Sequence, residues 1–214
     1  MRPRGFTLIE VLLATVLLAA GLALAFTTLR SATAMVQRGE AMAQRNERMR
    51  AVEGFLRRRI ASAESIAFAS DRDQQRQYRF LGEPARMRFV SDLPDYLGRG
   101  GPYLHDFVID SNGGRLLASF SMVQAARQVQ ESQARPPEIL ADDLRAVRFL
   151  YRGLDQDGRL GKWQDRWAAA DVLPLQVAIE IEAADGKAWP AMVVSLAQGS
   201  GQAQGVGGEM EPLP

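Results

Sequence analysis

The fold is decided by residues 1–30, MRPRGFTLIEVLLATVLLAAGLALAFTTLR. A short basic leader, residues 1–5, precedes an apolar run that continues to Leu29 with one formal charge, Glu10, and no proline. About 20 apolar residues at roughly 1.5 Å each cross the hydrocarbon core of a bilayer, so residues 6–29 are predicted to form a transmembrane helix. A carboxylate at that depth costs at least about 2.5 kcal/mol. We therefore expect Glu10 to have a partner and a function.

The amino-terminal segment differs from an ordinary signal peptide. Signal peptides have a shorter apolar core that is followed by a small-residue cleavage site. Here the apolar core is too long, and the expected cleavage point lies before it, between Gly5 and Phe6. Cleavage there leaves the membrane helix on the mature protein and creates a new amino terminus close to Glu10.

Residues 5–10, Gly-Phe-Thr-Leu-Ile-Glu, together with the apolar run resemble the type III signal of type IV pilins and pseudopilins. The resemblance implies that a prepilin peptidase cuts after Gly5 and methylates the new terminal amine of Phe6. It also implies that Glu10 docks against the positive terminus of another subunit in a filament. An amine and a carboxylate are each costly in lipid, and they neutralise each other when subunits bring them together.

Residues 30–66 are predicted to continue the helix as the soluble half of a long spine. No proline occurs between Pro3 and Pro84 to break it. Apolar residues recur at spacings of three, four and seven, which is typical of one helical face. We expect this stripe to contact partner subunits through Met35, Met42, Met49, Val52, Phe55 and Leu56. The adjacent basic triplet, residues 57–59, is interpreted as solvated helix surface, and the net charge of +1 gives no reason to expect a nucleic-acid partner.

Beyond residue 66 the apolar period switches from helical spacing to two, which is typical of half-exposed strands. Asn112-Gly113 between residues 103–110 and 115–122 predicts a hairpin, because both turn residues tolerate positive φ. A second hairpin is predicted around Asp185-Gly186. We therefore expect an α+β, pilin-like fold in which a long N-terminal helical spine, transmembrane in its first half, packs on antiparallel β-sheets. The β domain is assigned to residues 67–197, and residues 198–214, rich in Gly, Gln and Pro, are expected to be disordered.

No catalytic constellation is recognisable in the sequence. His105 is the single histidine, cysteine is absent, and a structural role is favoured for His105. Counting from Asp155, the sixth and twelfth positions of a calcium loop hold Leu160 and Arg166 instead of Gly and Glu, so the match fails. Trp163 and a nearby Trp167 are interpreted as cover for a sheet. We expect no enzymatic activity, no cofactor and no metal site.

Further similarities follow one another along the chain, at residues 57–60, 80–82, 87–91, 163–167 and 173–177. With these segments the chain looks like the J-type minor pseudopilins of type II secretion. The resemblance implies a structural subunit of the pseudopilus tip complex, which helps initiate pseudopilus assembly and protein export. It implies I-type and K-type minor pseudopilins, the major pseudopilin and the prepilin peptidase as partners.

The leader charges Arg2 and Arg4 favour a cytoplasmic amino terminus. The expected location is therefore the inner membrane, crossed once, with the C-terminal domain in the periplasm. Two other interpretations stay open. One is a minor pilin of a type IV pilus or competence system, and the other is a membrane-anchored periplasmic binding module that never polymerises.

Overall fold

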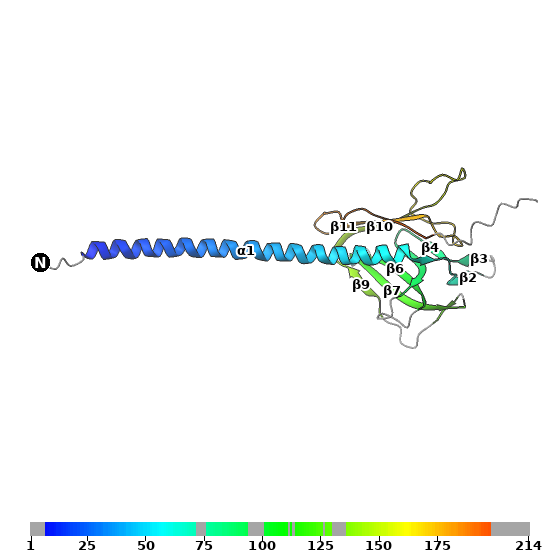
Figure 1. The fold of residues 1–214 in the computed structure, drawn as a ribbon, viewed down its shortest axis with the longest axis horizontal. Helices are drawn as coiled ribbons and strands as arrows, with labels where there is room; N and C mark the ends of the chain where they lie inside the picture. The colour runs from blue at the N-terminus through cyan, green and yellow to red at the C-terminus, as the bar shows by residue number, and fades with distance from the viewer. Residues whose placement is uncertain are drawn as a thin grey trace, which may run out of the picture. The chain divides into compact units, whose positions relative to one another are not determined.

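The computed structural model describes residues 7–71, 76–93, 101–110, 112, 114–125, 127–129 and 136–197. Within these ranges the chain forms one long helix followed by antiparallel strands (Figure 1). Two compact units are separated between Arg48 and Met49, so the last turns of the helix belong to the same unit as the strands. The predicted disordered tail, residues 198–214, lies outside the described residues.

Helix α1 runs from Leu8 to Ala61 over 54 residues. The next residue, Ser62, donates its backbone N–H to the carbonyl of Arg58 at 3.1 Å, and its hydroxyl donates to the same carbonyl at 2.8 Å. The same hydroxyl lies 3.3 Å from the carbonyl of Arg59, one of the carbonyls that a last helical turn leaves without a partner in the helix. The predicted helix boundary at residue 66 is wrong, because residues 63–64 leave the helix and pair with a strand instead.

The larger sheet is antiparallel and has seven strands in the described part of the chain. Its strands are β1 (Ala63–Glu64), β4 (Phe80–Gly82), β5 (Arg86–Asp92), β6 (Pro102–Asp110), β7 (Arg115–Gln124), β8 (Arg127–Gln128) and β9 (Glu138–Ala141). The order is β1-β5-β6-β7-β8, with β4 paired to β5 and β9 paired to β7. The predicted first hairpin is confirmed, since β6 and β7 pair from Tyr103 with Met122 to Asp110 with Arg115. Gly114 adopts φ 57° in its turn, a conformation that glycine reaches without strain.

A second antiparallel sheet has three strands in the order β10-β11-β12. Its strands are β10 (Leu144–Arg152), β11 (Gln176–Ala183) and β12 (Met192–Ser195). The predicted second hairpin is β11–β12, and Gly186 between them has φ 81°. Strands β2 (Ala69–Asp71) and β3 (Arg76–Tyr78) pair with each other.

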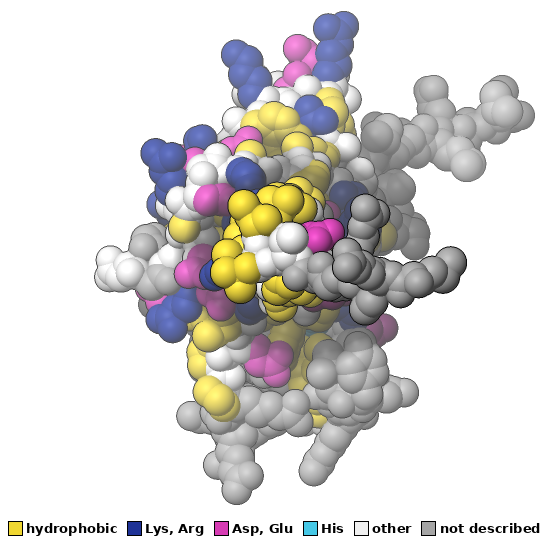
Figure 2. Space-filling view, turned by 90° about the vertical axis from the view of Figure 1, so that its left-hand side faces the viewer, with side chains coloured by type: hydrophobic (Ala, Val, Ile, Leu, Met, Phe, Trp, Pro, Cys, Tyr) yellow, Lys and Arg dark blue, Asp and Glu magenta, His cyan; other side chains and the backbone are white. Residues whose placement is uncertain are grey.

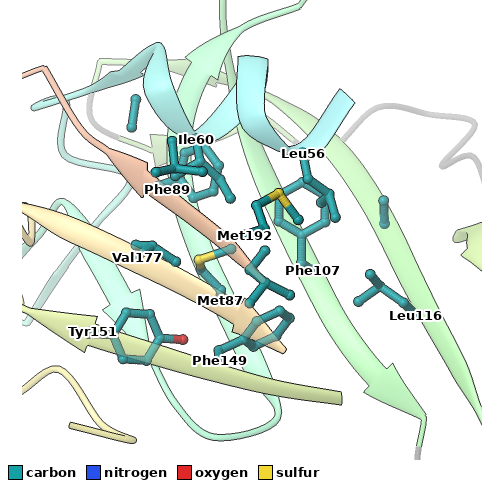
Figure 3. Close-up of a cluster of buried hydrophobic side chains, with 14 of the residues drawn as sticks. Leu56, Ile60, Met87, Phe89, Phe107, Leu116, Phe149, Tyr151, Val177 and Met192 are labelled. Carbon is teal, nitrogen blue, oxygen red and sulfur yellow. The ribbon is translucent and has the colours of Figure 1, made fainter. Parts of the chain in front are cut away.

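The core of the strand-bearing unit lies where the last turns of α1 meet both larger sheets (Figure 3). Val52, Leu56 and Ile60 are spaced four apart and so line one face of the helix, and Leu56 and Ile60 are 0% exposed. Burying such a side chain stabilises a fold by about 1.5–3 kcal/mol. The sheets contribute Phe80, Met87, Phe89, Phe107, Leu116, Phe149, Tyr151, Val177 and Met192. The predicted α+β class, with a long helix and antiparallel sheets, is confirmed.

Candidate functional site

The described residues begin at Thr7, within the segment that the sequence marks for processing and assembly. Gly5 and Phe6 lie outside the described residues. Glu10 is exposed in the first turn of α1, and its backbone N–H lies 3.1 Å from the carbonyl oxygen of Thr7. A carboxylate near the amino end of a helix is stabilised by the helix dipole. The geometry therefore presents Glu10 to whatever surrounds the helix.

The first part of α1 has an apolar surface without cover. Leu8, Ile9 and Leu24 keep 82, 75 and 69% of their surface exposed, and hydrophobic side chains gather at the near end of the helix in Figure 2. Among the described residues, α1 is the one helix that is long and apolar enough to cross a membrane. The unit before Met49 therefore carries an unburied surface of the kind that lipid or other apolar helices cover.

Three threonine hydroxyl groups of this apolar segment are satisfied within the helix. Thr15 donates to the carbonyl of Leu12 at 2.9 Å. Thr27 and Thr28 likewise donate to carbonyls three or four residues earlier, at 2.8–3.1 Å. Inside a bilayer each unsatisfied polar group costs several kcal/mol, so these internal bonds fit a membrane location. Glu10 is the one ionisable side chain between residues 8 and 29.

The predicted partner interface divides into two groups with different surroundings. Met35 and Met42 are 69 and 65% exposed, while Met49 and Phe55 are partly buried. Val52 and Leu56, at 8 and 0% exposure, belong to the unit's own core. Their assignment to a partner interface is therefore corrected, because the sheets of the same chain already cover them. The exposed Met35 and Met42 stay a prediction, as do the partly buried Met49 and Phe55.

Two arginines of the basic triplet connect α1 to the two larger sheets. The Nη1 group of Arg57 donates to the carbonyl of Val193 in β12 at 3.0 Å. Arg59 donates to the carbonyl of Asp92 at the end of β5. The sequence interpretation did not predict these bonds, because it treated residues 57–59 as solvated helix surface. Each of these two guanidinium groups satisfies a main-chain carbonyl at the end or edge of a sheet, so Arg57 and Arg59 have a structural role.

His105 is buried among aromatic side chains of β5, β6 and β7. Its ring stacks on Phe89 with centroids 5.5 Å apart and meets Phe120 edge-on at 5.1 Å. Nδ1 lies 3.0 Å from the carbonyl oxygen of Tyr103, so Nδ1 carries the proton, and Nε2 has no partner among the described residues. Burial lowers the pKa of His105 to about 4, the Tyr103 carbonyl opposes this shift, and the charge of Arg59 adds to it. The neutral, buried imidazole packs as a structural residue.

Trp167 packs against two glycines. A Cβ on Gly82 would lie 2.8 Å from the Cβ of Trp167, and one on Gly153 would lie 2.5 Å from its indole ring. The indole Nε1 donates to the carbonyl of Val172 at 2.8 Å. Trp167 therefore covers the edge of β4, as the sequence interpretation expects. Trp163 is placed differently, because its ring stacks on the guanidinium of Arg152 at 4.4 Å.

The Asp155–Gly158 turn binds its own backbone. One carboxylate oxygen of Asp155 accepts the backbone N–H groups of Asp157 and Arg159, at 3.0 and 2.8 Å. Among the described residues there is no group of three or more His, Cys, Asp and Glu side chains that could hold a metal ion. The carboxylate of Asp155 is therefore used to hold the turn itself.

Known proteins resemble this chain in its amino-terminal motif, in nearly the whole of its sequence and in its fold. Residues 1–26 match a family model described as the prokaryotic N-terminal methylation motif. The chain is 56% identical over 206 residues to type II secretion system protein J of Xanthomonas campestris pv. campestris, across 94% of this chain and 97% of that protein. A chain in the crystal structure of the GspK-GspI-GspJ complex from the enterotoxigenic Escherichia coli type 2 secretion system is similar with TM-score 0.50 at 14% identity. That match covers 71% of this chain and 97% of the other, and its likeness concerns the fold.

Proposed function

This chain belongs to the family of type II secretion system protein J, and from that premise we propose that it is a minor pseudopilin. It would act as a structural subunit of the pseudopilus tip complex that helps initiate pseudopilus assembly and protein export, with no catalytic step of its own. The main support for this proposal is the 56% identity to a type II secretion protein over nearly the whole of both chains. The same relative favours type II secretion over a type IV pilus or competence system.

The proposed maturation removes residues 1–5 and methylates the amine of Phe6. The match of residues 1–26 to a methylation motif supports this step. The mature chain would then sit in the inner membrane through residues 6–29, with the sheets in the periplasm. The uncovered apolar surface of α1 supports the membrane anchor, and the basic leader supports the orientation.

Glu10 is proposed to pair with the amino terminus of an adjacent subunit. Its carboxylate is exposed on an otherwise apolar helical surface, where an unpaired charge is costly in lipid. A cationic amine from a neighbour would neutralise it, so assembly would relieve the desolvation cost. The proposed neighbours are the I-type and K-type minor pseudopilins and the major pseudopilin. The structural relative was solved in a GspK-GspI-GspJ complex, which supports such a tip complex.

Mass spectrometry of the mature amino terminus, in cells with and without prepilin peptidase, tests the maturation step. We expect an N-methyl-Phe6 terminus that depends on the peptidase. An intact Met1, or a cut at another residue, would contradict the proposal.

Assembly is tested with Glu10→Leu in the full-length chain. We expect normal cleavage and methylation but loss of co-purification with the I-type and K-type partners from detergent extracts. Glu40→Leu is the matched control, because it removes a carboxylate from an exposed position of the same helix outside the apolar segment. Equal co-purification of wild type and Glu10→Leu would refute the assigned role of Glu10.

A further inference from the structure

A small hairpin follows β10 and projects two leucines to solvent. The backbone N–H of Gly161 donates to the carbonyl of Gly153 at 2.9 Å, and that of Asp155 donates to Arg159 at 2.7 Å. The carboxylate of Asp155 binds two further N–H groups in the turn, and Gly158 supplies the left-handed residue with φ 72°. Five residues of loop are thereby held in one conformation, so the hairpin is preorganised.

The two faces of this hairpin have different surroundings. On one face, Gly153 lies against the indole of Trp167 so closely that no Cβ would fit between them. Leu154 and Leu160 are bridge partners, and alternation along a strand directs them to the opposite face. They are 63 and 48% exposed. The structure therefore fixes an adjacent pair of large apolar side chains on the face that Trp167 does not cover.

Arg152 extends this face at the end of β10. Two residues before Leu154, it lies on the same side of the strand. Its guanidinium stacks on Trp163 at 4.4 Å, and its Nε donates to the side-chain oxygen of Gln176 at 2.7 Å. The two contacts fix the plane of the guanidinium, which reduces the entropy lost when it binds a further group.

The charge of Arg152 is not neutralised by a carboxylate in the described chain. Two other arginines of β10 show the contrast. Arg145 lies 3.0 Å from Glu182, and Arg148 lies 3.7 Å from Glu180. Arg152 instead meets a neutral amide and an indole ring, and among the described residues no acidic side chain pairs with it. An immobilised guanidinium of this kind is complementary to a carboxylate.

We propose that Arg152, Leu154, Leu160 and Trp163, here called the hairpin patch, bind an acidic side chain with apolar neighbours on another protein subunit of the pseudopilus tip. The inference rests on the proposed function and adds a surface of the sheet-bearing unit to the contacts of α1. Arginine and tryptophan are the residue types that most often dominate protein–protein interfaces, and the leucines supply the apolar area beside them. Because the Arg152 guanidinium is positively charged, the partner segment that binds it is expected to carry a carboxylate.

Binding of the full-length chain in detergent to full-length I-type and K-type minor pseudopilins tests the hairpin patch. The first variant is Arg152→Glu, and the second is the double variant Leu154→Ser with Leu160→Ser. The matched control is Arg148→Glu, which makes the same charge change at an exposed position of the same strand. Unchanged thermal unfolding verifies that each variant is folded, and the leucine variant tests the patch even where the arginine variant unfolds.

We expect both patch variants to weaken binding to one of the two partners about tenfold or more, with the control near wild type. Equal binding by wild type and folded patch variants would overturn the inference and leave the proposed function intact. Failure of the wild-type chain to bind either partner would overturn both. Normal partner binding together with lost secretion would also overturn the inference, because the patch would then serve an exported protein.

Discussion

Lowering the pH from 7 to 4 is expected to destabilise the sheet-bearing unit through His105. The imidazole is buried, with Nδ1–H bonded to the Tyr103 carbonyl and Nε2 without a hydrogen-bond partner among the described residues. Its pKa is lowered from 6.5 to about 4 in the folded chain, chiefly by burial. Between these pH values the unfolded chain binds a proton that the folded chain does not, so the free energy of unfolding falls as the pH falls.

The magnitude follows from the two pKa values. Stability from this residue is fully present above pH 6.5 and is lost progressively towards pH 4. At about 1.4 kcal/mol per pKa unit, the loss is about 2 kcal/mol at pH 5 and about 3 kcal/mol at pH 4. Such a loss is a large fraction of the stability of an ordinary domain.

Urea unfolding of the full-length chain in an uncharged detergent, followed by tryptophan fluorescence, measures this effect. The matched control is His105→Phe, which keeps a planar ring beside Phe89 and Phe120 but cannot titrate. Carboxylates contribute equally to the pH dependence of stability in the wild type and in His105→Phe. The difference between the two pH profiles therefore isolates the contribution of His105. Parallel profiles from pH 7 to pH 4 would refute the assignment of a neutral, buried His105.

Other substitutions test the packing. Gly153→Ala should destabilise the fold by about 1–3 kcal/mol, because the new methyl group would overlap an indole ring, whereas Gly39→Ala, with open space around it, should leave stability unchanged or raise it. Leu56→Ala should cost about 2–5 kcal/mol by leaving a cavity, while Met42→Ala should cost little because that side chain is exposed. Arg57→Ala should cost about 1 kcal/mol by removing a hydrogen bond from α1 to the edge of β12. Equilibrium urea unfolding measures all of these changes, and an equal cost for Leu56→Ala and Met42→Ala would contradict the assigned core.

The first part of the chain was predictable because its chemistry is local. A long apolar run, a basic leader and one carboxylate can be recognised without knowing what packs against them, and the family match over residues 1–26 agrees with that prediction. The hairpins were predictable for a similar reason, since Asn112 and Gly186 lie in turns between alternating segments. Register and turn chemistry act between residues that are close in sequence.

The apolar stripe of α1 shows where sequence reasoning stops. A helical period indicates that one face is covered, but it does not say by which surface. Val52 and Leu56 looked available for a partner, and the sheets of their own chain cover them. Met42 has the same apolar character, yet it is exposed. In the sequence, the exposed part of the stripe therefore looks the same as the buried part, and only the packing of the sheets separates the two.

The sequence by itself was enough to predict a membrane-spanning segment, a processing point at Gly5–Phe6 and the antiparallel character of the strands. The tertiary structure decided which polar and small residues have structural roles. Arg57 and Arg59 bond to carbonyls 136 and 33 positions away in the chain, and Gly153 is required by an indole that packs on it. The physical reason is that burial, ion pairing and steric fit depend on neighbours in space, whereas composition and periodicity report only neighbours along the chain.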